Sequence, residues 1–207
     1  RPGKRVLILG GAGGVGSAAI QLALPAQATI LATAGSAAKC DWMRAQGVHH
    51  AINYNDGAVE DAVLAATDGR GVDLVLDPIG GRGLARSLAM CAPLGRVVLF
   101  GASAISPGKR RSIVALLREG PAMRFFNLIP MFNRNVGVHC VNMLHLFETA
   151  PALLAGMMTE LLAGVAAGTL TPIISARFPL TAAGAAQAHD NLQDRKNVGK
   201  VLLIAKT

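Results

Sequence analysis

The glycines of the stretch GGAGGVG, which begins at Gly10, are the residues of this chain best suited to ligand chemistry. Gly11, Gly13 and Gly16 fit the pattern G-x-G-x-x-G of dinucleotide-binding turns. The first glycine permits a tight turn, the second lets a pyrophosphate approach the backbone, and the third lets the helix pack on the strand. The dipole and N–H groups at the start of the helix favour an anion. A plain strand–helix turn in an alanine- and glycine-rich chain gives the same pattern, so the surrounding elements must decide.

The end of the next predicted strand indicates which dinucleotide would bind. NAD-binding units usually carry an Asp or Glu about 20 residues after the glycines, whereas this chain reads ATAGSAAK and has no carboxylate there. Ser36 and Lys39 provide a hydroxyl and a cation that could receive a 2′-phosphate. The alternative is that Ser36 only caps a helix and Lys39 is solvated. The missing acid argues against NAD.

Other side chains that often do chemistry form no recognisable constellation. The five histidines have no metal-ligand spacing, and no G-x-S-x-G elbow is present. Cys40, Cys91 and Cys140 are far apart and form no C-x-x-C pair, which predicts buried free thiols and a reducing compartment. We therefore expect no metal site and no catalytic side chain; hydride transfer needs neither, because the cofactor carries that chemistry.

Composition limits the function classes further. A chain of 207 residues that is 52% hydrophobic can bury one substantial core, as one domain or a domain with a small appendage. No uninterrupted apolar run reaches membrane-spanning length and no signal-peptide pattern opens the chain, so we expect a cytoplasmic protein. The net charge is +8, but aromatic residues are only 4% and the basic residues are scattered, which argues against nucleic-acid binding.

Strand and helix patterns alternate along the chain and predict an α/β fold with a doubly wound parallel sheet of Rossmann type. The predicted strands span residues 5–9, 28–35, 49–54, 72–77, 96–101 and 136–141. Helices are predicted after the glycines and over residues 36–47, 56–71 and 80–95, the last closed by Pro93 and Gly95. Near the end of the chain, two strands over 171–180 and 199–205 flank a helix capped by Thr181.

Six segments occur in an order that resembles the medium-chain dehydrogenase/reductase superfamily, specifically its zinc-independent quinone oxidoreductase branch. They are GGAGGVG, TAGSAAK, AINY, GVDLVLDPIGG, APLGRVVLFG and DRKNVGKVLL. Residues 104–111 and the stretches SIVALLREG and NVGVHC are most similar to homologues of vesicle amine transport protein. The resemblance covers nearly the whole chain and implies NADPH-dependent reduction of quinones, enones or related conjugated carbonyls by hydride transfer.

The resemblance also implies which residues surround NADPH. Gly35, Ser36 and Lys39 would surround the 2′-phosphate, and Tyr54, the only tyrosine, would lie against the adenosine. The complete set of expected cofactor-binding residues is Gly11, Gly13, Gly14, Val15, Gly16, Gly35, Ser36, Lys39, Tyr54, Pro78, Phe100, Gly101, Ala102, Ser103 and Arg195. Within this set, the resemblance implies that Gly14 and Val15 would lie under the pyrophosphate and Arg195 near the phosphates. Pro78 and the turn from Phe100 to Ser103 match the nicotinamide side.

Members of this family also carry an N-terminal barrel-like domain that walls the nicotinamide and the substrate. We therefore divide the chain into a dinucleotide-binding domain, residues 1–171, and a C-terminal segment, residues 172–207, that would return to that domain. Without the barrel-like domain, we expect the chain to be inactive by itself. A nucleotide-binding or interaction module without catalysis is the alternative.

Two surfaces suggest partners. Residues 112–137 are basic and rich in apolar side chains, which fits either a peripheral membrane contact or, as we favour, the lining of a substrate cleft and packing on a neighbouring subunit. The stretch 136–141 would be an edge strand with unpaired backbone groups, which pairing with a second copy would satisfy. We therefore expect a twofold homodimer.

Overall fold

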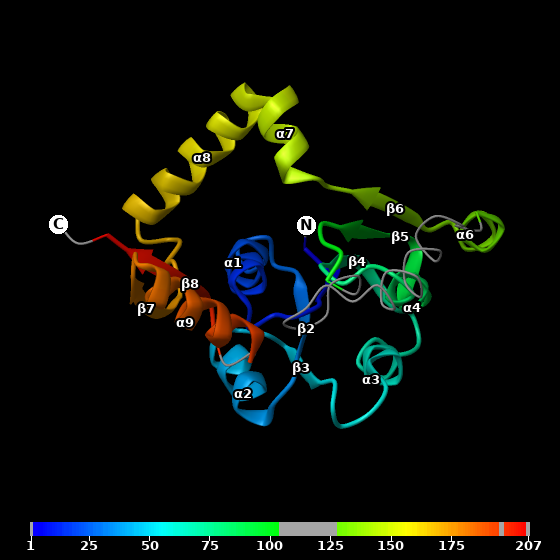
Figure 1. Cartoon of the computed structure of the whole chain (residues 1–207). Helices are drawn as coiled ribbons and strands as arrows, with labels where there is room; N and C mark the ends of the chain where they lie inside the picture. Colours follow the sequence, from blue (N-terminus) through cyan, green and yellow to red (C-terminus); the bar gives the residue numbers. More distant parts are fainter. Residues whose placement is uncertain (1, 104–127, 195–196, 206–207) are drawn as a thin grey trace.

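The fold is described from a computed structural model of the chain, which describes residues 2–103, 128–194 and 197–205. Its centre is a sheet of six parallel strands in the order β3-β2-β1-β4-β5-β6 (Figure 1). The strands are β1 (Arg5–Ile8), β2 (Thr29–Ala34), β3 (His50–Asn53), β4 (Val72–Asp77), β5 (Cys91–Leu99) and β6 (Gly137–Cys140). This order reverses between β1 and β4, which confirms the predicted doubly wound Rossmann-type fold.

Helices connect the strands as parallel pairing requires. The helices are α1 (Gly14–Ala23), α2 (Ala37–Ala45), α3 (Val59–Ala65), α4 (Gly83–Ala89), α6 (Ile129–Arg134), α7 (Met143–Thr149), α8 (Pro151–Ala166) and α9 (Ala182–Gln193). Figure 1 shows α1 and α2 on one face of the sheet and α3 and α4 on the other. Right-handed crossovers that reverse direction after β3 produce this arrangement.

The core has two layers because the side chains of β1 alternate between the faces of the sheet. Val6 and Ile8 pack with the residues of α1 and α2, whereas Leu7 and Leu9 pack with those of α3 and α4. All four are buried, as expected for a central strand covered on both faces.

Helix α4 is shorter than the sequence predicts. It ends at Ala89, and Cys91 already pairs with Val72 as the first residue of β5. Pro93 and Gly95, interpreted as a helix end, instead lie in an irregular part of β5 where Leu94 has a positive φ of 65°. A Cβ at Gly95 would lie 2.8 Å from the Val72 carbonyl oxygen, so glycine permits the close strand contact.

Cysteine placement follows the fold. Cys40 and Cys91 are buried free thiols, as predicted, and burial raises the pKa of Cys91 to about 11. Cys140 is also free but exposed, so the prediction of burial is wrong there. It lies at the end of β6, one of the two edge strands of the sheet, whose last two residues are exposed.

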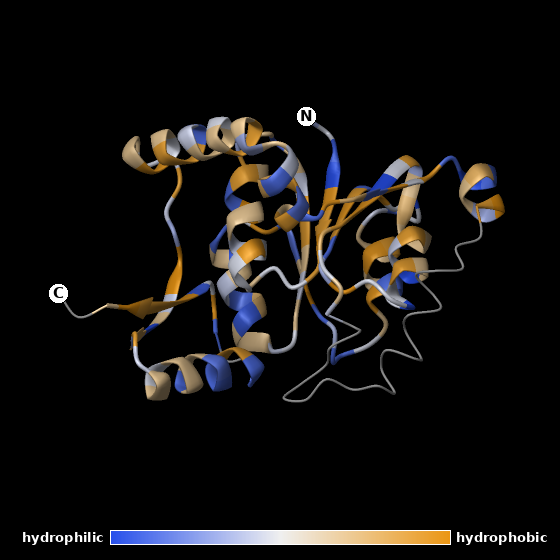
Figure 2. Ribbon diagram, turned by 45° about the horizontal axis from the view of Figure 1, so that its top comes forward, coloured by the Kyte–Doolittle hydropathy of each residue, from blue (hydrophilic) through white to orange (hydrophobic). Residues whose placement is uncertain are grey.

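Helices α7 and α8 were not predicted, and they project from the body of the molecule (Figures 1 and 2). Their exposed side chains include Leu144, Phe147, Leu153, Met157 and Leu162. Within the described part of the chain, no single helix is long and apolar enough to cross a membrane. The α7–α8 pair meets those criteria of length and composition only when both helices are counted together, and it is bent by 114°.

The C-terminal segment forms a second sheet of two parallel strands, β7 (Ile174–Pro179) and β8 (Lys200–Ile204), against which α9 packs. The Thr181 hydroxyl accepts a hydrogen bond from the Gly184 N–H and caps α9, as predicted. The start of β8 contacts the glycine turn, because the Gly199 N–H donates to the Ala12 carbonyl at 2.8 Å. The second sheet is therefore attached beside the start of α1.

Candidate functional site

A cleft of about 590 Å³ lies along the carboxyl ends of the strands, where the strand order reverses. Parallel sheets of this type bind ligands at that position. Its walls come from the turn after β1, the ends of β2 and β4, and the starts of α3 and α4. The polar side chains that line it include Lys39, Tyr54, Glu60, Asp77 and Ser103.

The glycine turn is held by β2. Gly10 has a φ of +72°, so the tight turn that the pattern assigns to Gly11 falls one residue earlier. The Gly10 N–H donates to the Thr33 hydroxyl at 3.1 Å, and the Gly11 N–H donates to the Thr33 carbonyl at 2.9 Å. Thr33 therefore fixes both glycines from the neighbouring strand, and the sequence pattern did not reveal this role.

The remaining glycines of the motif have different neighbours. A Cβ at Gly11 would lie 2.6 Å from the Met43 sulfur and 2.7 Å from the Ala32 Cβ, and one at Gly16 would collide with the Gly10 carbonyl. Both positions therefore need glycine for packing. Gly13 lines the cleft and precedes α1, whose first turn, Gly-Val-Gly-Ser, has no acidic side chain. The first N–H groups of this helix lack intrahelical acceptors and favour an anion.

The turn after β2 forms a polar corner of the cleft. The Ser36 hydroxyl accepts a hydrogen bond from the Lys39 N–H at 3.3 Å and caps α2, as the capping interpretation predicted. A hydroxyl that accepts this bond keeps its own proton to donate. The Tyr54 hydroxyl lies against Gly35, where a Cβ would collide with it. Asn55 donates from Nδ2 to the Gly35 carbonyl at 2.9 Å and ties the loop after β3 to the same turn.

The other end of the cleft is built from the turns after β4 and β5. The Asp77 carboxylate is fully buried and accepts hydrogen bonds from the N–H groups of Ile79 and Gly80 and from the Ser87 hydroxyl. It therefore shapes the turn after β4. The Ser103 N–H donates to the Pro78 carbonyl at 3.2 Å, which brings the two turns together.

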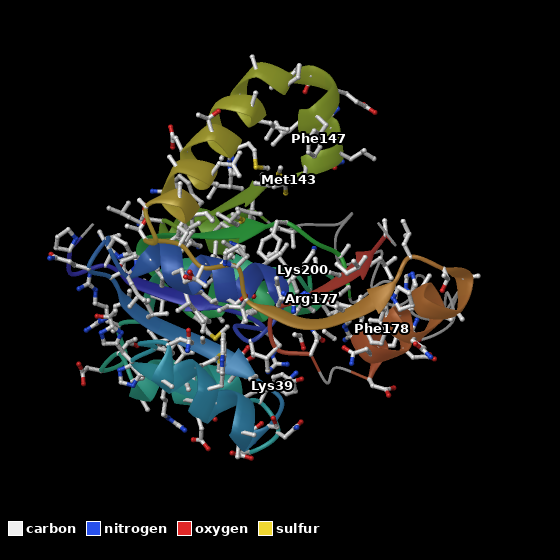
Figure 3. The ribbon with its side chains drawn as sticks, turned by 90° about the vertical axis from the view of Figure 1, so that its left-hand side faces the viewer. Lys39, Met143, Phe147, Arg177, Phe178 and Lys200 are labelled. Atoms are coloured by element: carbon white, nitrogen blue, oxygen red, sulfur yellow. The ribbon has the colours of Figure 1, made fainter. Side chains whose placement is uncertain are left out.

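The structure divides the predicted cofactor residues into three groups. Those that line the cleft are Gly13, Gly35, Lys39, Tyr54, Pro78 and Ser103. Those that support its walls or lie beside it are Gly11, Gly14, Val15, Gly16, Ser36, Phe100, Gly101 and Ala102. Arg195 lies outside the described residues. Figure 3 shows Lys39 at the start of α2, away from Met143 and Phe147 on α7.

An ion pair on the cleft wall escaped the sequence analysis. Glu60 on α3 and Arg86 on α4 are joined by two hydrogen bonds, and Arg86 Nη2 lies 2.6 Å from Glu60 Oε2. The hydrogen bond from Arg86 lowers the pKa of Glu60 despite partial burial of the carboxyl. The two residues are 26 positions apart in the sequence, so no local sequence pattern predicts the pair.

A metal centre would need converging donor side chains. Within residues 2–103, 128–194 and 197–205, no group of three or more His, Cys, Asp or Glu is placed to hold a metal ion.

Comparisons with known proteins identify what this chain is similar to. A family model described as zinc-binding dehydrogenase matches residues 46–203. The human synaptic vesicle membrane protein VAT-1 homolog is 32% identical over 204 residues, which are 99% of this chain and 51% of that protein. The chain spans about half the length of the curated relatives it matches.

Two solved structures share the fold. The CurK enoyl reductase has 29% identity and a TM-score of 0.75, with 100% of this chain and 56% of that chain covered. The Escherichia coli quinone oxidoreductase complexed with NADPH has 24% identity and a TM-score of 0.78, with 99% and 58% covered.

Proposed function

The chain belongs to the zinc-binding dehydrogenase family, within the medium-chain dehydrogenase/reductase superfamily of oxidoreductases, and we propose that it is an NADPH-binding domain. The proposed parent reaction is the reduction of quinones, enones or related conjugated carbonyls. The observation that carries the proposal is the corner after β2, where Lys39, the Tyr54 hydroxyl and the capped start of α2 meet without a carboxylate at the end of the strand.

The residues present fit a phosphorylated dinucleotide. The start of α1 offers backbone N–H groups and a positive dipole end to a pyrophosphate. Lys39 supplies a cation for a 2′-phosphate, and Ser36 and Tyr54 supply hydroxyl donors. An Asp or Glu at the end of β2, which would favour the 2′-hydroxyl of NAD, is replaced by the sequence AGS. The donor set therefore matches NADPH better than NADH.

The chain's own contribution to the reaction is binding and orientation. When NADPH is bound, its nicotinamide supplies a hydride to an electrophilic carbon of the substrate. The buried Asp77 carboxylate fixes the turn that holds Pro78, and Pro78 in turn fixes Ser103. These two turns position the nicotinamide end of the cleft. Conjugated carbonyls are proposed as substrates because an enoyl reductase and a quinone oxidoreductase are among the chain's structural relatives.

Full activity is a proposal for the whole protein rather than for these residues. Reductases must also position the substrate and exclude water around the nicotinamide. Pro78 and Ser103 line the cleft, and we propose that their two turns supply one side of the nicotinamide end. We therefore propose that this chain binds NADPH but turns over quinones slowly when isolated.

Three further proposals concern location and partners. We propose a cytoplasmic protein and a homodimer formed through β6, which lies at the edge of the sheet as predicted. We also propose that residues 112–137, of which 112–127 lie outside the described residues, line a substrate cleft and pack on a neighbouring subunit, with peripheral membrane contact as the alternative.

Calorimetric titration of the 207-residue chain with NADPH and NADH tests the proposal. We expect saturable binding of NADPH, weaker binding of NADH, and little NADPH oxidation with a quinone. No binding of NADPH at millimolar concentration would contradict the assigned function. Rapid quinone reduction by the chain alone would contradict its proposed dependence on further residues.

A further inference from the structure

The Glu60–Arg86 ion pair lies on the cleft wall and has no role in the function proposed above. Arg86 is the more exposed partner, with 61% of its side chain accessible, whereas Glu60 is 23% accessible. Both side chains line the cleft, together with Val59 on the same helix as Glu60 and Ile79 in the turn after β4. This wall therefore combines a carboxylate, a guanidinium and apolar side chains.

The covalent structure of a dinucleotide indicates which part would reach this wall. The ribose that carries the 2′-phosphate also carries the base, so the base must lie next to the corner formed by Lys39 and Tyr54. The pyrophosphate is attached to the same ribose and extends toward the start of α1, so the base must extend away from α1. Gly57, Val59 and Glu60 all line the cleft and follow Tyr54 closely in the chain, so the start of α3 is the wall beside that corner.

The ion pair has the chemistry to recognise a purine with an amino group. An ionised carboxylate offers about four acceptor positions, and Arg86 occupies one on each oxygen of Glu60. A remaining position can accept a hydrogen bond from the exocyclic amine of adenine. A purine with a carbonyl at the same position presents an acceptor there instead. Its donor on that edge is the N1–H, one ring position away, so the base would have to shift to reach Glu60.

We propose that the Glu60–Arg86 pair selects the adenine base of the cofactor, with Glu60 accepting from the amino group and Arg86 holding Glu60 in place. The proposal rests on the proposed function, because the base reaches this wall only if the dinucleotide occupies the cleft. Arg86 also offsets the charge of Glu60, so the carboxylate does not repel the nearby phosphates. Val59, on the same helix as Glu60, provides an apolar surface for the face of the ring.

The test compares NADPH with its 6-oxo analogue, reduced nicotinamide hypoxanthine dinucleotide phosphate. The native chain should bind NADPH about tenfold more tightly than the analogue, the effect expected for one hydrogen bond to a charged acceptor at a partly exposed site. Glu60→Gln should bring the two dissociation constants within about twofold, because a side-chain amide can turn its N–H toward a carbonyl. A role of the pair in joining α3 to α4 alone would not change this ratio.

Asp61→Asn is the matched control, because it removes one negative charge from the same helix turn outside the cleft. It should keep the native preference for NADPH over the analogue. Equal binding of both nucleotides by the native chain, or an unchanged preference in a folded Glu60→Gln variant, would overturn the inference alone. Failure of the native chain to bind either nucleotide would overturn the proposed function and this inference with it.

Discussion

The cleft edge of the sheet and the α7–α8 pair differ in how their residues are held. At the cleft edge, turns from separate strands are linked to one another, as Thr33 holds the glycine turn and Asp77 holds the turn after β4. Helix α8 is rich in apolar residues, and the side chains of Leu153, Met157 and Leu162 on it are exposed.

The difference shows which features of the sequence specify the isolated fold. The cleft edge is held by hydrogen bonds inside the chain. The apolar face of a helix normally packs on a core, whereas several large apolar side chains of α8 are exposed. Substitutions should therefore have unequal consequences in the two regions.

Leucine-to-alanine substitutions should show the largest difference in unfolding free energy between the two regions. Leu31 in β2 is fully buried, so Leu31→Ala should lower the free energy of unfolding by about 2–5 kcal/mol. Leu153 on α8 is 57% exposed, so Leu153→Ala should change it by less than about 0.5 kcal/mol. Urea unfolding of both variants provides the measurement, and similar losses would show that α8 belongs to the cooperative core.

Glycine-to-alanine substitutions should act in opposite directions. At Gly11 the added Cβ would meet the Ala32 Cβ at 2.7 Å, so Gly11→Ala should destabilise the chain by about 1–3 kcal/mol and weaken NADPH binding. At Gly156, inside α8, nothing lies within 4 Å of the added Cβ. Gly156→Ala should therefore stabilise the chain by about 0.5–1 kcal/mol. Thermal unfolding compares them, and destabilisation by Gly156→Ala would mean that α8 packs more closely than described.

The amino end of the sheet should respond to pH, independently of the cleft. Burial acts to raise the pKa of Asp73. Hydrogen bonds from the Lys4 ammonium and the Arg5 N–H act in the opposite direction and together outweigh burial, so the pKa lies below its ordinary value of 3.8. A depressed carboxyl pKa stabilises the fold above that value, and the contribution is lost as pH falls through the folded-state pKa. Between about pH 6 and about pH 3, Asp73→Asn should lose less stability than the native chain in urea unfolding. Equal losses of stability in the variant and the native chain would show that Asp73 does not cause the pH dependence.

Local signals predicted much of the fold. The Ser36 and Thr181 caps, the strand over residues 72–77 and the central position of β1 follow from sequence patterns, and the structure confirms each. The end of α4 was predicted wrongly because Pro93 and Gly95 are common both after helices and in irregular strands. Helices α7 and α8 were not predicted, since α7 is short and the mostly apolar composition of α8 gives little periodicity.

The site was predicted less completely than the fold. Local patterns indicated the glycines, Ser36 and Lys39, whereas Tyr54 and Pro78 came from the family resemblance. Thr33 and the Glu60–Arg86 pair depend on contacts between elements distant in the chain. The sequence gives no specific signal for Thr33, because the same strand also contains Thr29. Glu60 and Arg86 carry no such signal, because charged residues are common on helices of every kind.

The central claim is that the corner after β2 binds a 2′-phosphate, and dissociation constants of NADPH and NADH for Lys39→Ala test it most directly. A charge-assisted contact at a partly exposed site is worth roughly 1.5–3 kcal/mol, about ten- to a hundredfold in affinity. Lys39→Ala should weaken NADPH by about that factor and leave NADH nearly unchanged, with a smaller difference at high salt. Arg44→Ala removes a charge from the same helix outside the cleft and should change neither. Equal weakening of both nucleotides by Lys39→Ala, or no weakening of NADPH, would contradict the assignment.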